Sequence, residues 1–319
     1  MGYNMKPSVT ITVSCHKPFC VPRSALYLPI HVGSATSSLS IDGAQRDDEG
    51  DNISSRNFSY CELTGQYWAW KNLTSDYIGQ CHYRRYFAFS RPRCAPNDHA
   101  QYEIPLLNQS AIRDLQLDNT ELILSKVTKY DVIVPKTWSV SCTMTPSGVK
   151  RTVREHMVGY GLVSDEMLDR LVSLTSRLAP TYLEDVVSYL DGHTYLGYNC
   201  FIMKRELFHK LCEFEFPVLA AFDETFSYEG LSSQQKRVCG YFGEILFSAF
   251  INHISRDRSL RIVHVPMVFF ERTDPEDAEP SEDAPSSEVS TWKTRILPLG
   301  SRRRLWAGMF RNYITGLFS

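Results

Sequence analysis

The segment SYCELTGQYWAWKNLTSDYIGQCHYRRYF, residues 59–87, decides the fold class of this chain. Ser59 and Glu62 have the spacing of a capping box, so the first half of the segment predicts a helix that begins at Ser59. Leu63, Tyr67 and Trp70 follow at helical spacing and are expected to face the core. A short turn then leads into the second half of the segment.

That second half predicts a buried strand that starts at Tyr77 and ends in basic and aromatic residues. His82, Arg84 and Arg85 stand at its carboxyl end. In open α/β sheets, ligands bind beyond the carboxyl ends of the strands. We therefore expect these three side chains to face a ligand at the edge of the sheet.

An earlier strand end carries polar residues of the same kind. The β-branched run VTITVSC, residues 9–15, predicts the first buried strand. His16 and Lys17 follow it, and Pro18 ends the ladder because proline has no N–H to donate. Two interpretations stay open: an ordinary loop, or the lip of a ligand site, since the loop after the first strand of α/β folds usually holds a nucleotide.

The acidic run DDEGDN, residues 47–52, also has two interpretations. A run of charges is usually a solvated loop. Alternatively, Asp51 or Asn52 hydrogen-bonds a hydroxyl group of a ribose or a sugar.

Two segments in the second half of the chain predict further strands. Residues 195–203, YLGYNCFIM, place Asn199 inside an apolar strand, where its amide must be hydrogen-bonded. The partner is either another part of the protein or a ligand. Residues 262–270 predict the last strand.

Two carboxylates lie on predicted helices. Capping-box spacings at residues 181–184 and 232–235 open these helices. Asp191 lies at the end of the first helix. Glu244 lies on the second, and the sequence does not decide whether its side chain points inward or outward.

The composition excludes several classes of protein. The net charge of −2 does not favour a general affinity for nucleic acid, and the basic cluster is local. Nine cysteines without a C-x-x-C pair predict reduced, mostly buried thiols. The first residues lack a long apolar run, so we expect neither a signal peptide nor a membrane span, and a cytoplasmic location.

Alternating short strands and helices predict an α/β fold with a mostly parallel central sheet flanked by helices. The chain contains none of the motifs G-x-G-x-x-G, G-x-x-x-x-G-K-[ST], G-x-S-x-G or H-E-x-x-H. The remaining signal is the set of basic residues at strand ends. Such groups suit a diphosphate, because guanidinium groups bind phosphate oxygens and neutralise a leaving diphosphate.

The C-terminal part differs in composition from the rest. Residues 273–290 are acidic and rich in proline, which predicts a disordered linker. Residues 291–319 join a basic cluster to apolar and aromatic residues. This tail either lies on an anionic membrane, which would place the protein on the inner face of the plasma membrane, or packs on its own domain.

Eight segments, in order along residues 9–272, resemble the DUF4422 family of bacterial capsular and exopolysaccharide biosynthesis proteins. They are SCHKPF, LPIHVG, GDNIS, YCELTGQYWAWKN, DYIGQCHYRRYF, YDVIVPK, YNCFIMKRELF and QKRVCGYFGE. The resemblance implies one nucleotide-sugar glycosyltransferase domain of the GT-A type over residues 1–272. Some members of the family resemble galactofuranosyltransferases.

The resemblance also implies positions for a donor. The first strand, with Ser14, and the GDNIS segment would hold the nucleotide, and Asn199 would touch the donor sugar. The CHYRRYF segment would take the place of a D-x-D metal motif. Because it holds no paired carboxylates, we predict no metal ligand; Mn²⁺ or Mg²⁺ stays an alternative to a cationic clamp made by protein side chains.

The implied reaction transfers a glycosyl unit, such as galactofuranose or another hexose, from the nucleotide diphosphate to a lipid-linked saccharide. An inverting transfer needs a carboxylate base close to the acceptor hydroxyl. Glu244 is the first candidate and Asp191 the second; a purely structural role of Glu244 stays open. The rival function is a non-catalytic saccharide- or nucleotide-binding scaffold of a polysaccharide assembly complex.

Overall fold

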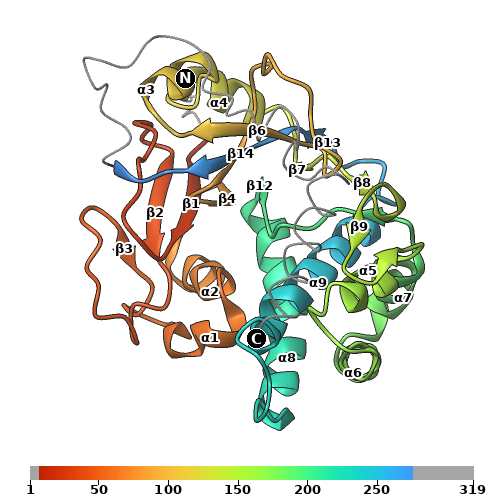
Figure 1. Cartoon of the computed structure of the whole chain (residues 1–319). Helices are drawn as coiled ribbons and strands as arrows, with labels where there is room; N and C mark the ends of the chain where they lie inside the picture. The colour runs from red at the N-terminus through yellow and green to blue at the C-terminus, as the bar shows by residue number, and fades with distance from the viewer. Residues whose placement is uncertain (1–6, 276–319) are drawn as a thin grey trace, which may run out of the picture.

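The VTITVSC segment forms strand β1 (Val9–Cys15), as the sequence predicts, and all its side chains except that of Thr10 are buried. Such continuous burial is typical of a parallel strand that is covered on both faces. β1 pairs in parallel with β2 (Tyr27–His31) and with β4 (Tyr77–His82). The structure is a computed structural model that describes residues 7–275 (Figure 1).

These strands belong to a ten-stranded sheet with the order β13-β7-β12-β4-β1-β2-β3. Only β12 (Phe201–Lys204) runs antiparallel to its neighbours along this path, so the mostly parallel α/β prediction is confirmed. A side branch joins β14 to β5 and β6, with β5 also paired to β4. The remaining strands of the sheet are β3 (Gln45–Arg46), β5 (Arg85–Phe87), β6 (Gln101–Leu106), β7 (Val132–Pro135), β13 (Ile262–Val265) and β14 (Met267–Arg272).

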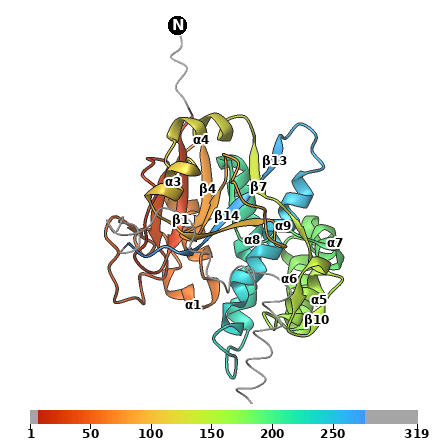
Figure 2. The same cartoon turned by 45° about the horizontal axis from the view of Figure 1, so that its top comes forward.

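Helices cover both faces of the sheet (Figures 1 and 2). Along β12, Phe201 and Met203 join the core under α2, α8 and α9, whereas Ile202 joins the core under α3 and α4. Alternate residues of a strand therefore point into two separate cores. The helices are α1 (Asn57–Tyr60), α2 (Leu63–Asn72), α3 (Gln109–Asp114), α4 (Thr120–Val127), α5 (Val153–Gly159), α6 (Asp165–Leu178), α7 (Leu183–Asp191), α8 (Arg205–Thr225) and α9 (Val238–Ile254).

Short elements connect these layers. Two small ribbons lie on the side of α5 to α7 in Figure 1, one made by β9 and β10 and the other by β8 and β11. The bounds are β8 (Trp138–Ser139), β9 (Met144–Thr145), β10 (Gly148–Val149), β11 (Thr194–Tyr195), η1 (Ser54–Arg56), η2 (Val140–Cys142), η3 (Pro180–Tyr182) and η4 (Gln235–Arg237).

The capping box predicted at Ser59 and Glu62 is wrong. The Ser59 hydroxyl shares a hydrogen bond with Tyr228, and the Glu62 carboxylate accepts one from Asn199. A short helix, α1, ends at Tyr60, and α2 starts after the Glu62 backbone without a side-chain cap. Both side chains are bound by distant segments, so local spacing could not reveal their partners.

Of the three residues expected to face the core from α2, Leu63 is fully buried, whereas Tyr67 and Trp70 are half-buried. Both side chains pack against the core, as predicted: their rings contact Phe216 of α8, a buried core residue, and the Trp70 ring is stacked on it. The interior side of α2 also includes Gln66, a polar residue that apolar spacing does not select.

The other two capping boxes differ from each other. Ser232 and Gln235 exchange the expected hydrogen bonds, which confirms that prediction; the turn opens η4, and α9 follows. The box at residues 181–184 is wrong, because η3 precedes α7 there and no side chain caps the helix.

Two predicted strands are each divided. Residues 195–203 form the end of β11, a turn, and then β12, so Asn199 lies in the turn and not in a strand. Residues 262–270 form β13 and part of β14, which meet at Pro266. Proline cannot donate a ladder hydrogen bond, and the two strands pair with different neighbours.

All nine cysteines lie in the described part of the chain and are free thiols, and five of them are buried. This confirms the prediction of reduced thiols. No helix within residues 7–275 is long and apolar enough to cross a membrane. The predicted linker, from residue 276 onward, and the predicted tail, residues 291–319, lie outside the described residues.

Asp131 ties together the starts of β7 and β13 and the end of β12. Its Oδ2 accepts hydrogen bonds from the backbone N of Arg261 at 2.7 Å and from Arg261 Nε at 3.3 Å. Its Oδ1 lies 2.8 Å from Lys204 Nζ. Burial alone would raise the pKa of Asp131, but the hydrogen bonds from Lys204 and Arg261 lower it to about 2.

We expect Asp131→Asn to destabilise the protein by roughly 1–2 kcal/mol at pH 7, with the loss shrinking in acid. The folded-state pKa lies below the unfolded value of about 3.9, so the carboxylate stabilises the fold above about pH 4 and ceases to do so as the pH falls toward 2. Urea unfolding at several pH values would measure this difference. Asp42→Asn, on an exposed loop, is the control, and a difference that stays constant from pH 6 to pH 3 would contradict the prediction.

Candidate active site

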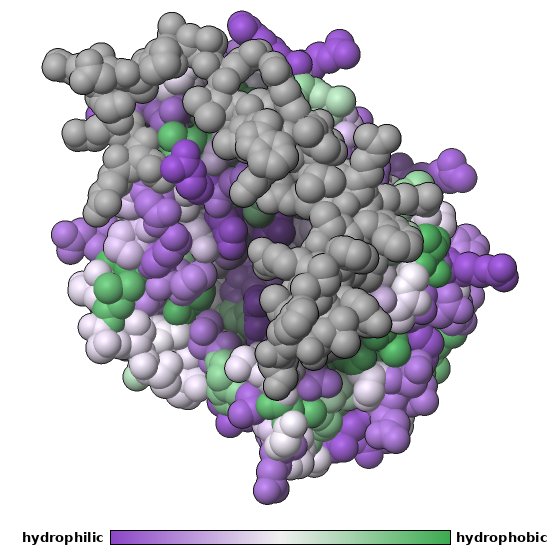
Figure 3. Space-filling view, in the orientation of Figure 1, coloured by the Kyte–Doolittle hydropathy of each residue, from purple (hydrophilic) through white to green (hydrophobic). Residues whose placement is uncertain are grey.

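Two adjoining cavities lie at the carboxyl ends of β1 and β4. Cavity A has a volume of about 350 Å³, and cavity B of about 380 Å³. Figure 3 shows a recess lined by hydrophilic residues near the centre of this face of the molecule. His16, Glu62, His82 and Arg237 line both cavities. Cavity A is completed by Ser14, Val32, Asn57, Phe58, Cys61 and Ser233, and cavity B by Cys81, Tyr83, Arg84, Arg85, Tyr198, Asn199, Cys200 and Glu244.

Three guanidinium groups supply the positive charge of the cavities. Arg84 and Arg85 follow β4, and each has a buried Nε that finds no hydrogen-bond partner within residues 7–275. The Arg85 guanidinium lies over the rings of Tyr198 and Phe269, 5.1 Å from each centroid. Arg237 precedes α9, and its Nε donates to Cys61 Sγ at 3.1 Å. None of the three forms an ion pair with a carboxylate of the described residues, so their charge is available to an anion.

The two histidines do not add to this charge. Burial lowers the pKa of His82 well below its usual value, and the neighbouring Arg85 and Arg84 lower it further. Burial and then the charges of Lys17 and Arg84 lower the pKa of His16. Both rings are therefore neutral at neutral pH and can offer hydrogen bonds to a ligand.

Glu244, on α9, is half-buried and faces cavity B. Its Oε2 accepts a hydrogen bond from the Tyr195 hydroxyl, and the Tyr198 backbone N–H also reaches the carboxylate. Burial raises the pKa of Glu244 to about 7; the Tyr195 hydrogen bond opposes the rise, and the nearby Glu62 charge adds to it. A carboxylate that titrates near pH 7 can accept a proton from a hydroxyl group and later release it.

The wall between Glu244 and Glu62 is a left-handed turn. Gly197, Tyr198 and Asn199 have φ angles of 58°, 71° and 44°. Non-glycine residues rarely adopt this conformation, and it persists only where other interactions hold it. A Cβ atom at Gly197 would lie 2.1 Å from the Tyr195 ring, so only glycine fits there.

The Asn199 side chain holds this turn in place. Its Nδ2 donates to Glu62 Oε1 at 2.8 Å and to the Gly240 carbonyl at 3.2 Å. Its backbone carbonyl accepts a hydrogen bond from Gln80 Nε2 at 3.0 Å. Asn199 lines cavity B, and its Oδ1 atom is buried without a hydrogen-bond partner among the described residues. Asn199 thus has the structural role that the sequence left open, and one atom remains for a ligand.

Behind Asn199, a chain of buried polar groups continues into the core. Gln80 Nε2 lies 3.4 Å from Gln66 Oε1, and Gln66 Nε2 donates to Glu215 Oε2 at 2.7 Å. Glu215 is fully buried, and this burial raises its pKa to about 8, partly offset by the Gln66 hydrogen bond. The protonated acid can end the chain without an unpaired charge in the core.

Seven of the eleven residues predicted from the sequence meet in the two cavities: Ser14, His16, His82, Arg84, Arg85, Asn199 and Glu244. The other four line neither cavity. Lys17 Nζ pairs with Asp274 at 2.5 Å, Asp51 accepts from the Tyr67 hydroxyl, Asn52 bonds within its own loop, and Asp191 is exposed at the end of α7.

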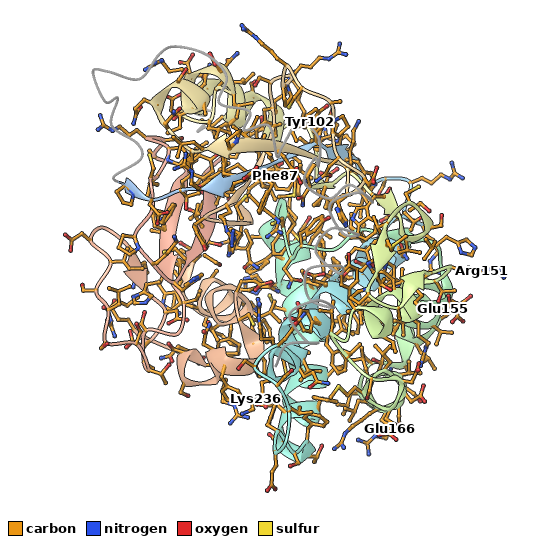
Figure 4. All side chains as sticks on the ribbon, viewed as in Figure 1. Phe87, Tyr102, Arg151, Glu155, Glu166 and Lys236 are labelled. Atoms are coloured by element: carbon orange, nitrogen blue, oxygen red, sulfur yellow. The ribbon has the colours of Figure 1, made fainter. Side chains whose placement is uncertain are left out.

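Three cavity residues were not predicted as site residues from the sequence. Arg237 and Phe58 were not singled out, and Glu62 was assigned to a helix cap. Arg237 is the N-cap of α9, and Glu244 follows it by seven residues, so both lie on one side of the helix with Tyr241 between them. This polar stripe opposite an apolar face was a detectable signal. η4 packs against α1, and Lys236 lies beside α1 in Figure 4, which shows how the start of α9 reaches the cavities.

Comparisons with known proteins agree with this geometry. The profile of a family described as a domain of unknown function, DUF4422, matches residues 10–256. The apo structure of the bifunctional glycosyltransferase WbbM is similar, with a TM-score of 0.76 and 30% sequence identity over 87% of this chain and 48% of that chain. This chain thus spans about half the length of WbbM, and the match confirms the expected GT-A-like fold. Among curated proteins, the search found no match.

We expect Glu244→Gln to stabilise the protein in alkaline solution, by roughly 1–2 kcal/mol at pH 8.5. The folded-state pKa of about 7 lies above the unfolded value of about 4.3. Wild-type stability therefore falls as the pH rises from about 4 to 7 and levels off above 7, whereas glutamine cannot ionise. The measurement is the melting temperature of both proteins between pH 5 and pH 9.

The matched control is Glu166→Gln, an exposed glutamate on α6 that Figure 4 shows at the outer edge of the molecule. It should follow the wild type at every pH. If the Glu244→Gln difference did not grow with pH, Glu244 would not be the group described here.

Proposed function

The chain belongs to the DUF4422 family, and we propose that it is a glycosyltransferase that takes a sugar from a nucleotide diphosphate donor. One observation carries the proposal: three guanidinium groups, which form no ion pair with a carboxylate of the described residues, and a carboxylate of pKa about 7 line adjoining cavities at the strand ends of a GT-A-like fold. The similarity to WbbM, a bifunctional glycosyltransferase, supports the same reaction class.

The donor would extend across both cavities. The diphosphate fits best where the two cavities meet. Arg237, His16 and His82 line both cavities there, and Arg84 lines cavity B. Guanidinium groups bind phosphate oxygens in bidentate fashion, and neutral imidazoles add directed hydrogen bonds. The sugar then lies in cavity B and the nucleoside in cavity A.

The reaction is a single displacement at the anomeric carbon. Glu244 accepts the proton of the acceptor hydroxyl as its oxygen forms the new bond to that carbon. The bond from the carbon to the diphosphate oxygen breaks at the same time, and the electron pair leaves with the nucleotide. Tyr195 orients the Glu244 carboxylate through its hydrogen bond.

Negative charge that develops on the leaving diphosphate is stabilised by Arg84 and Arg237. Fixed charges aimed at the developing charge stabilise a transition state because they need no reorganisation. His82, Tyr83 and Arg84 occupy the position that the family resemblance gives to a D-x-D motif, and these groups do not fit a divalent cation. Within residues 7–275 no group of three or more His, Cys, Asp or Glu side chains is placed to hold a metal ion.

The finer assignments complete the proposal. The donor is a UDP-sugar, such as UDP-galactofuranose or another UDP-hexose, and the acceptor is a lipid-linked saccharide of capsule or exopolysaccharide synthesis. Residues 1–272 carry the reaction in the cytoplasm, and residues 291–319 bring it to the inner surface of the plasma membrane. The alternative, a non-catalytic scaffold, retains ligand binding but turns over no donor.

We expect Glu244→Gln to reduce donor turnover by about 10²–10⁴-fold, the range typical of a lost general base. Wild-type kcat/KM should rise with pH through about 7, because the ionised carboxylate is the active form, and the variant should lose this dependence. Release of the nucleoside diphosphate from UDP-galactofuranose, UDP-galactose and UDP-glucose is the measurement. Glu166→Gln is the control; no turnover by the wild type of any donor would favour the scaffold.

We expect Arg84→Met to lower kcat/KM by about 10²-fold, because one of the charges facing the leaving diphosphate is lost. Addition of EDTA should leave wild-type turnover unchanged if the arginines neutralise the diphosphate. Arg23→Met, at an exposed position, is the control. Full loss of activity in EDTA that Mn²⁺ restores would refute the arginine clamp.

A further inference from the structure

We infer that Phe58 is a stacking platform for the nucleobase of a nucleoside diphosphate, which makes cavity A the nucleoside subsite. The inference rests on the proposed function for the identity of the ligand and adds a residue to it. Phe58 lies on α1 and lines cavity A together with Ser14, Asn57 and Ser233. It is 47% exposed, and the other large hydrophobic side chains exposed within residues 7–275 are aliphatic.

The Phe58 ring is exposed but held in position. The ring of Tyr228 contacts it edge-on, with centroids 5.1 Å apart and planes at 78°. The Arg56 guanidinium lies 5.4 Å from its centroid. Asp223 fixes both neighbours, because it pairs with Arg56 and accepts a hydrogen bond from the Tyr228 hydroxyl at 2.6 Å.

A rigid aromatic ring that keeps half of its surface in water is costly unless a partner covers it, and flat apolar groups are its natural partners. A nucleobase has such a face, whichever base it is. The Tyr228 hydroxyl also shares a hydrogen bond with the Ser59 hydroxyl, with 2.9 Å between the two oxygens. The Phe58 platform is therefore organised before a ligand binds.

A second observation on the same cavity points to a polar ligand. The Ser14 hydroxyl is buried, with a residue exposure of 1%, and no group within residues 7–275 forms a hydrogen bond with it. Buried hydroxyl groups are nearly always hydrogen-bonded, so an unpartnered one on a cavity wall favours a ligand with donors and acceptors, such as a ribose. The arginines begin where cavity A meets cavity B, which is the order base, ribose, diphosphate.

The test compares ligands with and without a base. Isothermal titration calorimetry measures the dissociation constants of UDP, GDP, CDP, dTDP and inorganic pyrophosphate for the full chain. In Phe58→Ala, the dissociation constant of the best-binding nucleotide should rise about tenfold, the size of one lost base–aromatic stack, while that of pyrophosphate stays unchanged.

Three further variants make the comparison specific. Phe58→Tyr should bind nucleotides as the wild type does, because the ring is kept. Phe58→Leu should lose most of the affinity that Phe58→Ala loses, because it keeps apolar surface but no ring. Leu178→Ala, at a position on α6 that is 48% exposed, should change nothing.

The outcomes separate this inference from the proposed function. Nucleotide binding that depends on the Phe58 ring supports the platform even if no donor is turned over, in which case the transferase proposal fails alone. Equal losses for nucleotide and pyrophosphate, unchanged nucleotide binding in Phe58→Ala, or no binding of any of the four nucleotides would each overturn the platform. Donor turnover that Phe58→Ala leaves intact would then keep the transferase proposal.

Discussion

The side-chain amide of Asn199 is the interaction on which the candidate site depends. It bonds to Glu62 before α2 and to the Gly240 carbonyl of α9, while the Asn199 carbonyl is bound by Gln80 of β4. One buried residue therefore connects a strand, two helices and a left-handed turn. Because unpaired buried amides are costly, these elements cannot separate without losing several hydrogen bonds at once. The geometry of both cavities follows from this junction.

Much of the fold could be predicted because it is encoded locally. The β-branched run at residues 9–15 gives the observed bounds of β1, and polar residues at the ends of β1 and β4 indicate the edge of the sheet where the cavities lie. The predictions that were wrong concern residues whose hydrogen-bond partners are distant in sequence. Ser59 and Glu62 have the spacing of a cap, but Tyr228 and Asn199 bind them. At these two positions, hydrogen bonds to distant segments replace those of the local capping box.

The site was predictable in outline but not in its electrostatics. Side-chain types located the basic cluster, yet the charge state of His82 depends on burial beside Arg84 and Arg85, which spacing cannot show. The same holds for Glu244, whose burial raises its pKa although Tyr195 donates a hydrogen bond to its carboxylate. The neutral imidazoles and the fixed guanidinium charges contribute no change in the charge of the cavities over the physiological pH range. Only the carboxylate responds to pH there.

The side branch of the sheet ends at β6, which pairs with β14 alone among the described strands. A free strand edge invites pairing with another chain, and such pairing leads to aggregation. The sequence of β6, QYEIPL, places Glu103 and Pro105 on this strand. Proline removes one backbone donor, and a charged side chain resists burial in a new ladder. Both residues thereby disfavour intermolecular growth of the β-sheet at this edge.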